Sequence, residues 1–304
     1  MTFRKYCWLQ ARLLALFVLL VWAPLGCAAE KVLYDKPSQY NNIIVTEDDN
    51  GLRVLRFERH GARQSIAKPG DPAYLGFAYT KVAFVGLALA PEPQRIMIVG
   101  VGGGTMPMFL RHYYSNATID AVDIDPDVVH VAKEYFGFRE DPKLRAHVRD
   151  GRQFVESVRD PYDVIFLDAF GASTVPPHLT TVEFMRAVRR AVKPDGVVVG
   201  NIWGRHMNPL YDSMVRTYQE VFDELYILEV PGTTNRIMLA LPRKQALDHA
   251  QLARLARKTA ADKRFDFDMG AFEPAQFSYA STKSRAGQVL RDADQPQSTR
   301  ALSR

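Results

Sequence analysis

Cysteine is scarce in this sequence: of 304 residues only Cys7 and Cys27 are cysteines, and both precede Glu30. Removal of the N-terminal segment, or acylation of Cys27, leaves no pair of thiols, which excludes a disulfide framework and a cysteine metal site. We expect no metal ion. Blocks of Lys or Arg are missing too, so the net charge of +5 does not predict nucleic-acid binding. The Gly-Lys-Ser/Thr phosphate loop of ATP- and GTP-hydrolysing proteins is also absent.

Apolar runs long enough to cross a bilayer are lacking as well. The run from Leu13 to Trp22 follows the basic residues Arg4 and Lys5 and is shorter than the roughly 20 residues that a bilayer requires, which is typical of a signal peptide. Two processing sites are compatible with the sequence, a lipoprotein box ending at Cys27 and cleavage after Ala29. A third alternative is that the segment is not cleaved and serves as a membrane anchor. We therefore expect residues 1–29 to be a signal segment. The protein would be exported to the periplasm or tethered to the membrane as a lipoprotein, or cytoplasmic if the anchor is uncleaved and faces inward.

The segment 30–70 is predicted to form a small β domain. Short apolar runs at 42–46 and 52–57 flank a turn at 48–51 that contains Gly51, which is typical of a β-hairpin. Residues 74–90 then show helical spacing of apolar side chains, and Pro91 follows directly.

From Arg95 onward, predicted strands alternate with predicted helices. The strands are expected at 96–99, 119–122, 144–148, 164–167 and 197–199, and the helices at 106–114, 127–136, 152–158, 182–192 and 209–221. This order predicts an α/β fold with a mostly parallel sheet, because strands this apolar must be buried on both faces. Segments 225–230 and 236–241 around Gly232 predict a terminal antiparallel hairpin near the sheet edge. We place the main domain at 71–262 and an irregular, partly disordered tail at 263–304, since the polar residues from Lys283 on have no pattern.

Four consecutive predicted strands end in glycine or aspartate. Gly100, Gly102 and Gly104 follow the first strand, and Asp123, Asp150 and Asp168 follow the next three. Ligands of open α/β sheets bind outside the carboxyl ends of the strands, so these residues are expected to meet. Glycines let a ligand approach the backbone, Asp123 is placed to hold ribose hydroxyls, and Asp150 to accept from an exocyclic amine. Each residue alone is better explained as a cap or turn residue, as we expect for Asp125 before Pro126. Together they indicate an adenosine-type ligand.

The motifs between Ile96 and Trp203 resemble the spermidine synthase (polyamine aminopropyltransferase) family, whose fold is the Rossmann-like class I methyltransferase fold. The matching stretches are 100–104, 122–126, 149–151, 162–168 and 192–196, and the segment 38–43 is similar to part of that family's small N-terminal β domain. The resemblance implies transfer of an aminopropyl group from decarboxylated S-adenosylmethionine to a diamine such as putrescine. The residues it implies for the donor are Asn41, Gly100, Gly102, Gly104, Asp123, Ile124, Asp150 and Gly151. Tyr79, Asp168 and Ser173 would form the acceptor site, with Asp168 as the proton acceptor.

The sequence departs from the family at the acceptor site. The second of two family aspartates, three residues after Asp168, is Gly171 here, with Ser173 the nearest polar residue. Lys81 has the wrong sign for a polyamine pocket unless its side chain points away. His178 is interpreted as an exposed or structural histidine rather than a base near the site. Phe170 and Trp203 are more readily explained as core residues than as adenine-stacking ones, although both roles stay open.

Three functions remain open at this point. The first is an aminopropyltransferase acting on a small polyamine or another amine. The second is a methyltransferase that uses S-adenosylmethionine itself, with Lys81 pairing with the donor carboxylate. The third is an exported protein that binds a nucleoside or polyamine without turnover. A homodimer is one candidate assembly.

Overall fold

The computed structural model describes residues 30–171, 175–280, 284 and 286–295. The expected signal segment, Ser173 and the last part of the tail lie outside these residues. None of the helices in the described ranges has the length and hydrophobicity that a membrane-spanning segment requires.

The N-terminal part of the described chain is a four-stranded antiparallel sheet in the order β1-β2-β3-β4. Its strands are β1 (Lys31–Pro37), β2 (Asn42–Glu47), β3 (Arg53–Arg56) and β4 (Arg63–Ala67). The expected hairpin is present as β2 and β3, which pair antiparallel around the turn at 48–51. The sheet also contains β1 and β4, whose mixed polar sequences did not reveal them.

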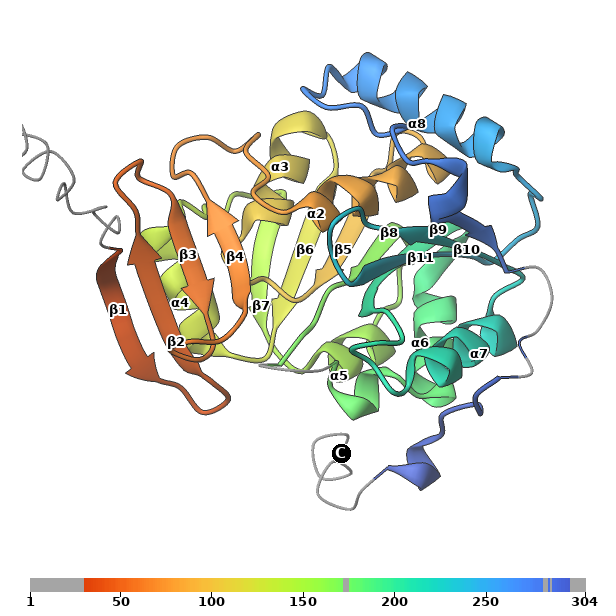
Figure 1. Cartoon of the computed structure of the whole chain (residues 1–304), viewed down its shortest axis with the longest axis horizontal. Coiled ribbons are helices and arrows are strands. Elements are labelled where there is room, and N and C mark those ends of the chain that lie inside the picture. The colour runs from red at the N-terminus through yellow and green to blue at the C-terminus, as the bar shows by residue number, and fades with distance from the viewer. Residues whose placement is uncertain (1–29, 172–174, 281–283, 285, 296–304) are drawn as a thin grey trace, which may run out of the picture.

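An eight-stranded sheet forms the larger part of the molecule, in the order β12-β10-β11-β9-β8-β5-β6-β7 (Figure 1). The strands are β5 (Arg95–Val99), β6 (Thr118–Asp123), β7 (Leu144–Val148), β8 (Tyr162–Leu167), β9 (Val192–Trp203), β10 (Glu224–Glu229), β11 (Asn235–Leu241) and β12 (Phe277–Tyr279). The pairs from β7 to β9 are parallel, and β11 adds antiparallel to β9. The order reverses at β5 and β8, which is where ligands of such sheets bind.

Helices cover both faces of this sheet (Figure 1). They are α2 (Ala78–Ala83), the 3-10 helix η1 (Phe84–Leu89), α3 (Thr105–Tyr113), α4 (Pro126–Tyr135), α5 (Gly151–Glu156), α6 (Val182–Ala191), α7 (Tyr211–Val221) and α8 (His249–Lys263). Short 3-10 helices lie at Pro177–Leu179 (η2), Pro274–Gln276 (η3) and Asp292–Asp294 (η4). Helix α4 begins as expected, because the Asp125 side chain accepts from the Asp127 amide and Pro126 has no N–H that would require an acceptor.

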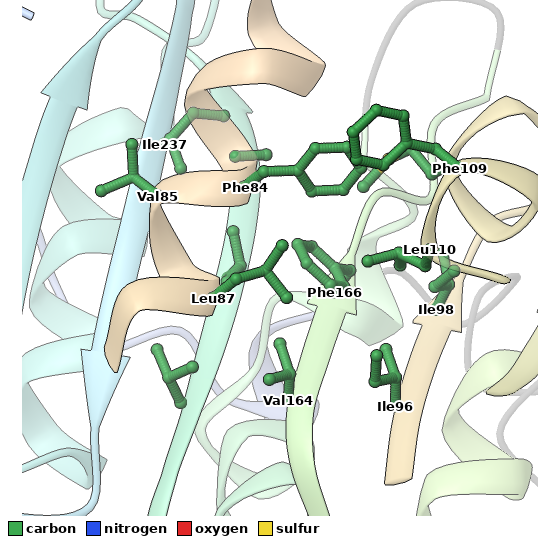
Figure 2. Packing of buried hydrophobic residues seen from close by; sticks show 14 of the residues in the cluster. Phe84, Val85, Leu87, Ile96, Ile98, Phe109, Leu110, Val164, Phe166 and Ile237 are labelled. Carbon is green, nitrogen blue, oxygen red and sulfur yellow. The ribbon is translucent and has the colours of Figure 1, made fainter. Parts of the chain in front are cut away.

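The core consists of two apolar layers, one on each face of the central sheet. Helices η1, α3 and α8 pack on one face, and α5, α6 and α7 on the other. In the first layer the rings of Phe84 and Phe109 stack with centroids 4.7 Å apart, and Phe166 of β8 packs edge-on against Phe84 (Figure 2). A third apolar cluster joins the small sheet to α4, where Ile43 and Leu55 meet Val131. The two sheets are therefore held together by buried side chains.

Three expectations differ from the structure. The helix predicted at 74–90 begins only at Ala78 and tightens into η1 at Phe84, where Gly86 lies so close to β9 that a Cβ would come within 2.3 Å of Val199. The terminal hairpin is confirmed as β10 and β11, but the edge itself is the three-residue strand β12, which is too short to show a period. Residues 284 and 286–295 of the supposedly disordered tail pack on α6 and α7 through hydrogen bonds.

Candidate active site

A cavity of about 270 Å³ lies at the carboxyl ends of β5, β6, β7 and β8, as predicted. Most of the predicted site residues line it. These are Asn41, Tyr79, Gly100, Gly102, Asp123, Ile124, Asp150, Gly151 and Asp168. The small sheet and the segments beside it close one side with residues that sequence analysis did not select, among them Tyr40, Phe57, Gln64 and Ser65. Their polar and aromatic side chains follow no strand-end rule, so only the three-dimensional fold reveals them.

The glycine loop brings the chain close to the end of β8. Gly100 has φ +104°, and a Cβ there would lie 2.4 Å from the backbone oxygen of Asp168, so no other residue fits without displacing that residue. Gly102 has φ +53° and also lines the cavity. Gly104 does not line it. Gly104 precedes α3 with φ +75°, and a Cβ would come within 2.8 Å of the Phe138 ring, so packing explains this glycine better than ligand contact.

Asp123 is held at the end of β6 by two backbone amides. Its Oδ2 accepts from the Val101 amide at 2.9 Å and its Oδ1 from the Asp125 amide at 3.0 Å. Burial raises the pKa of Asp123 to about 6 although these hydrogen bonds oppose the shift. The carboxylate is thus fixed at the cavity wall beside the glycine loop.

Asp150 is both a helix cap and part of a buried pair. Its Oδ1 accepts from the Gln153 amide at 2.9 Å, and its Oδ2 lies 2.8 Å from Nε2 of His178. Burial acts to raise its pKa, but the hydrogen bonds from His178 and from the Gln153 amide outweigh it and the pKa of Asp150 lies below its ordinary value. His178 is buried, so the exposed alternative in its interpretation is wrong and the structural one remains, and it also lines the cavity. Asp150 therefore caps helix α5, the alternative that the sequence left open, and it also lines the cavity.

Asp168 receives one hydrogen bond on each oxygen. Tyr79 donates to Oδ2 at 2.9 Å and Asn201 donates to Oδ1 at 2.8 Å. Asn235 donates in turn to Oδ1 of Asn201 at 2.8 Å, which fixes the orientation of that amide. Burial raises the pKa of Asp168 to about 6 despite the bonds from Asn201 and Tyr79, which lower it. Burial and the adjacent Asp168 carboxylate raise the pKa of Tyr79 well above its usual value, so Tyr79 acts as a neutral donor.

Asn201 is the contact of Asp168 that sequence analysis missed. It directly follows the apolar run Val197–Gly200 near the end of β9, the same position at which the aspartates were found on other strands. The rule that selected carboxylates at strand ends would have found it if amides had been included.

Charge is distributed unevenly around the cavity. Its described lining contains three carboxylates, those of Asp123, Asp150 and Asp168, and no Lys or Arg. Lys81 is turned elsewhere, with its Nζ 5.5 Å from the centre of the Phe267 ring. It therefore does not line the cavity, and the pairing of Lys81 with a donor carboxylate is not supported.

The end of β8 continues into residues of apolar and aromatic character. Phe170 and Gly171 line the cavity next to Asp168, and the Phe170 ring lies 5.4 Å from the ring of Trp203. Ser173, predicted as a substrate contact, lies outside the described residues. Among the described residues, no group of three or more His, Cys, Asp or Glu side chains is arranged to hold a metal ion.

Comparisons with known proteins bear on this site directly. The model of the family described as "Spermine/spermidine synthase domain" matches residues 77–241, more than half of the chain. The chain belongs to this family. It is 34% identical over 245 residues to the polyamine aminopropyltransferase of Vibrio vulnificus, with 76% of this chain and 81% of that protein covered.

Two solved structures have the same fold. A spermidine synthase in complex with the transition state analogue AdoDATO superposes with a TM-score of 0.61 at 22% identity, covering 79% of this chain and 80% of that one. Human methyltransferase-like protein 13 in complex with SAH superposes with a TM-score of 0.57 at 27% identity, covering 62% of this chain and 93% of that one. The predicted Rossmann-like methyltransferase fold preceded by a small β domain is confirmed. The family places the chain among the transferases.

Proposed function

We propose that this protein transfers an aminopropyl group from decarboxylated S-adenosylmethionine to an amine, with the diamine putrescine as the first acceptor to test. The observation that carries the proposal is the charge of the cavity: three carboxylates and no Lys or Arg among its described lining residues. The decarboxylated donor carries a sulfonium and an ammonium group and no carboxylate. Such a dication is favoured by an acidic site, whereas a free carboxylate there would have no cationic partner.

The reaction itself requires little beyond alignment and the removal of one proton. The amine nitrogen forms a bond to the donor's propyl carbon next to sulfur, and the carbon–sulfur bond breaks with its electron pair left on sulfur. The products are methylthioadenosine and a secondary ammonium. An ammonium acceptor must first lose a proton, because its nitrogen has no free electron pair.

Asp168 is the group that takes this proton. Its oxygens are oriented by Tyr79 and Asn201, and each oxygen keeps a lone pair beyond the bond it accepts. Burial raises its pKa to about 6, which makes it a better base than an exposed aspartate while it is still ionised at neutral pH. Asp123 would hold the donor ribose and Asp150 the adenine end.

A methyltransferase is the second candidate, and the similarity to methyltransferase-like protein 13 supports it. S-adenosylmethionine carries a carboxylate as well as its two cationic groups. Lys81 is turned toward Phe267, so the charge of the cavity favours the decarboxylated donor over this one.

The test is calorimetric titration of the full chain with decarboxylated S-adenosylmethionine, S-adenosylmethionine and methylthioadenosine, followed by addition of putrescine and detection of products. We expect the decarboxylated donor to bind at least tenfold more tightly than S-adenosylmethionine and spermidine to form. Preferred binding of S-adenosylmethionine with methyl transfer would favour the second candidate. If a nucleoside binds but none of a panel of amines is converted, the protein would be a binding protein rather than an enzyme. The variant Asp123→Ala should weaken binding of all three nucleosides, since it removes the proposed ribose contact.

A further inference from the structure

The last described segment of the chain reaches the nucleoside end of the cavity from outside. Residues 286–295 cross α7 and α6 below the central sheet (Figure 1). The Gln288 amide donates to Ser213 Oγ at 3.1 Å, and the Leu290 amide donates to Thr217 Oγ1 at 3.0 Å, both on α7. The Val182 amide at the start of α6 donates to the Leu290 carbonyl at 2.8 Å.

The segment ends in an ion pair whose arginine is buried and whose aspartate side chain is 39% exposed. Asp292 accepts two hydrogen bonds from Arg152, at 2.7 Å from Nη1 and 2.6 Å from Nη2, although 140 residues separate them. The Asp292 amide also donates to Glu183 of α6 at 3.0 Å. The Arg152 side chain is only 9% exposed, so its charge depends on these acidic partners rather than on water. Glu156 supplies a further acceptor at 2.8 Å from Nε.

Arg152 connects this ion pair to the cavity wall. It follows Asp150 and Gly151, which both line the cavity, and its Nη1 makes a longer contact of 3.4 Å with the His178 carbonyl. The His178 ring is in turn paired with Asp150 at 2.8 Å. Arg152 therefore belongs to the helix that Asp150 caps, and it contacts the main chain of His178, the residue that orients the Asp150 carboxylate.

We propose that Asp292 is a positioning residue for the nucleoside end of the active site, acting through Arg152 on the pair formed by His178 and Asp150. This rests on the proposed function to the extent that an adenine nucleoside binds at Asp150. Asp168 is held by other residues, Tyr79 and Asn201, so the proton acceptor is independent of this connection. Loss of Asp292 should thus weaken donor binding and leave the chemical step largely intact.

The variant Asp292→Asn tests this, because it removes the charge and keeps the size of the side chain. We expect its Kd for methylthioadenosine to rise about tenfold and its KM for the donor to rise similarly, with kcat within about twofold of wild type. Asp292→Glu, which retains the charge, should recover part of the affinity. Asp294→Asn is the matched control, since Asp294 lies in the same turn and is exposed.

A second comparison separates positioning from general destabilisation. The double variant Arg152→Gln with Asp292→Asn should bind methylthioadenosine no more weakly than Arg152→Gln alone, because both changes remove the same connection. If Asp292→Asn lowers Tm but leaves Kd and KM unchanged, the contact is only structural and the proposal is overturned. If wild type itself binds no adenine nucleoside, the proposed function fails first, and the two failures are distinguished by the wild-type titration.

Discussion

Tyr79 and Asp168 share a hydrogen bond of 2.9 Å that joins α2 to the end of β8. Tyr79 donates, and because its pKa is raised it remains a donor throughout the pH range of the reaction. With Asn201 on the other oxygen, the carboxylate cannot rotate without losing a partner. This fixed orientation is what a base needs when it must accept a proton from an amine held in one position.

Replacing Asp168 with Asn should abolish most of the transfer. We expect the rate to fall by about 100-fold or more, because the amide cannot accept the proton, while the Kd of methylthioadenosine changes by less than about twofold. Initial rates and calorimetry measure the two quantities. Asp160→Asn, an exposed aspartate, is the control. Loss of nucleoside binding in Asp168→Asn would instead place Asp168 in the donor site.

The same variant should change stability in a pH-dependent way. Burial raises the folded-state pKa of Asp168 to about 6, above its ordinary value, so its contribution to stability is lost as the pH rises through 6. At pH 8 the ionised, buried carboxylate destabilises the fold, and Asp168→Asn should raise Tm by a few degrees. The difference in Tm should vanish below about pH 4, where the carboxyl is protonated in both states. A variant with lower Tm at pH 8 would contradict the assigned pKa direction.

The acidic limb of the pH–rate profile should report on Tyr79. In wild type, kcat/KM should fall about tenfold per pH unit below a midpoint near 6, since this parameter reports on the free enzyme and Asp168 must be ionised to accept a proton. Tyr79→Phe removes a bond that lowers this pKa, so the midpoint should move upward by up to about one unit. Tyr40→Phe is the control, because Tyr40 lines the cavity whereas the described hydrogen bonds to Asp168 come from Tyr79 and Asn201. An unchanged midpoint in Tyr79→Phe would mean that another group titrates.

Gly100 should tolerate no side chain. In Gly100→Ala the added Cβ would lie 2.4 Å from the Asp168 backbone oxygen, and residue 100 has φ +104°, which strains an alanine. We therefore expect the free energy of unfolding to fall by about 2 kcal/mol or more and transfer to be lost. Gly232→Ala is the matched control, since it also has positive φ (+69°) but nothing lies within 4 Å of its Cβ. It should lose only about 1 kcal/mol and keep its activity. Denaturant unfolding of both variants makes the comparison.

A carboxylate at position 171 should improve the use of diamines. Gly171 lines the cavity two residues beyond Ala169, and the neighbouring Phe170 offers no charge to a second ammonium. Gly171→Asp should raise kcat/KM for putrescine relative to n-butylamine by about tenfold, the effect of one charge-assisted hydrogen bond. Gly171→Asn, which has the same size without the charge, should leave the ratio near that of wild type. An equal ratio in both variants would indicate that the distal end of the acceptor lies elsewhere.

The residues at the ends of parallel strands were the most predictable part of this molecule. Gly100, Asp123, Asp150 and Asp168 are brought to one cavity because parallel strands all point their carboxyl ends to the same edge. What could not be predicted is how each is held. The His178 partner of Asp150 and the Asn201 partner of Asp168 come from distant segments, and no local pattern links them.

The elements that escaped prediction are those whose stability comes from distant contacts. Strand β12 has three residues and is defined only by its pairing with β10. The segment 286–295 is polar and unpatterned because it binds mainly through its backbone and through the pair of Asp292 with Arg152. Composition therefore suggested disorder for a segment whose order depends on partners elsewhere in the chain.

The cavity is lined by residues of both sheets. Asn41 and Ser65 come from the small sheet and the segment that enters it, whereas Asp123 and Asp168 come from the central one. A ligand in contact with both adds its binding free energy to the apolar contacts with α4 that hold the sheets together. Backbone amides of β2 and β4 should then exchange with deuterium more slowly in the presence of nucleoside, so the protection of the small sheet becomes a direct measure of donor occupancy.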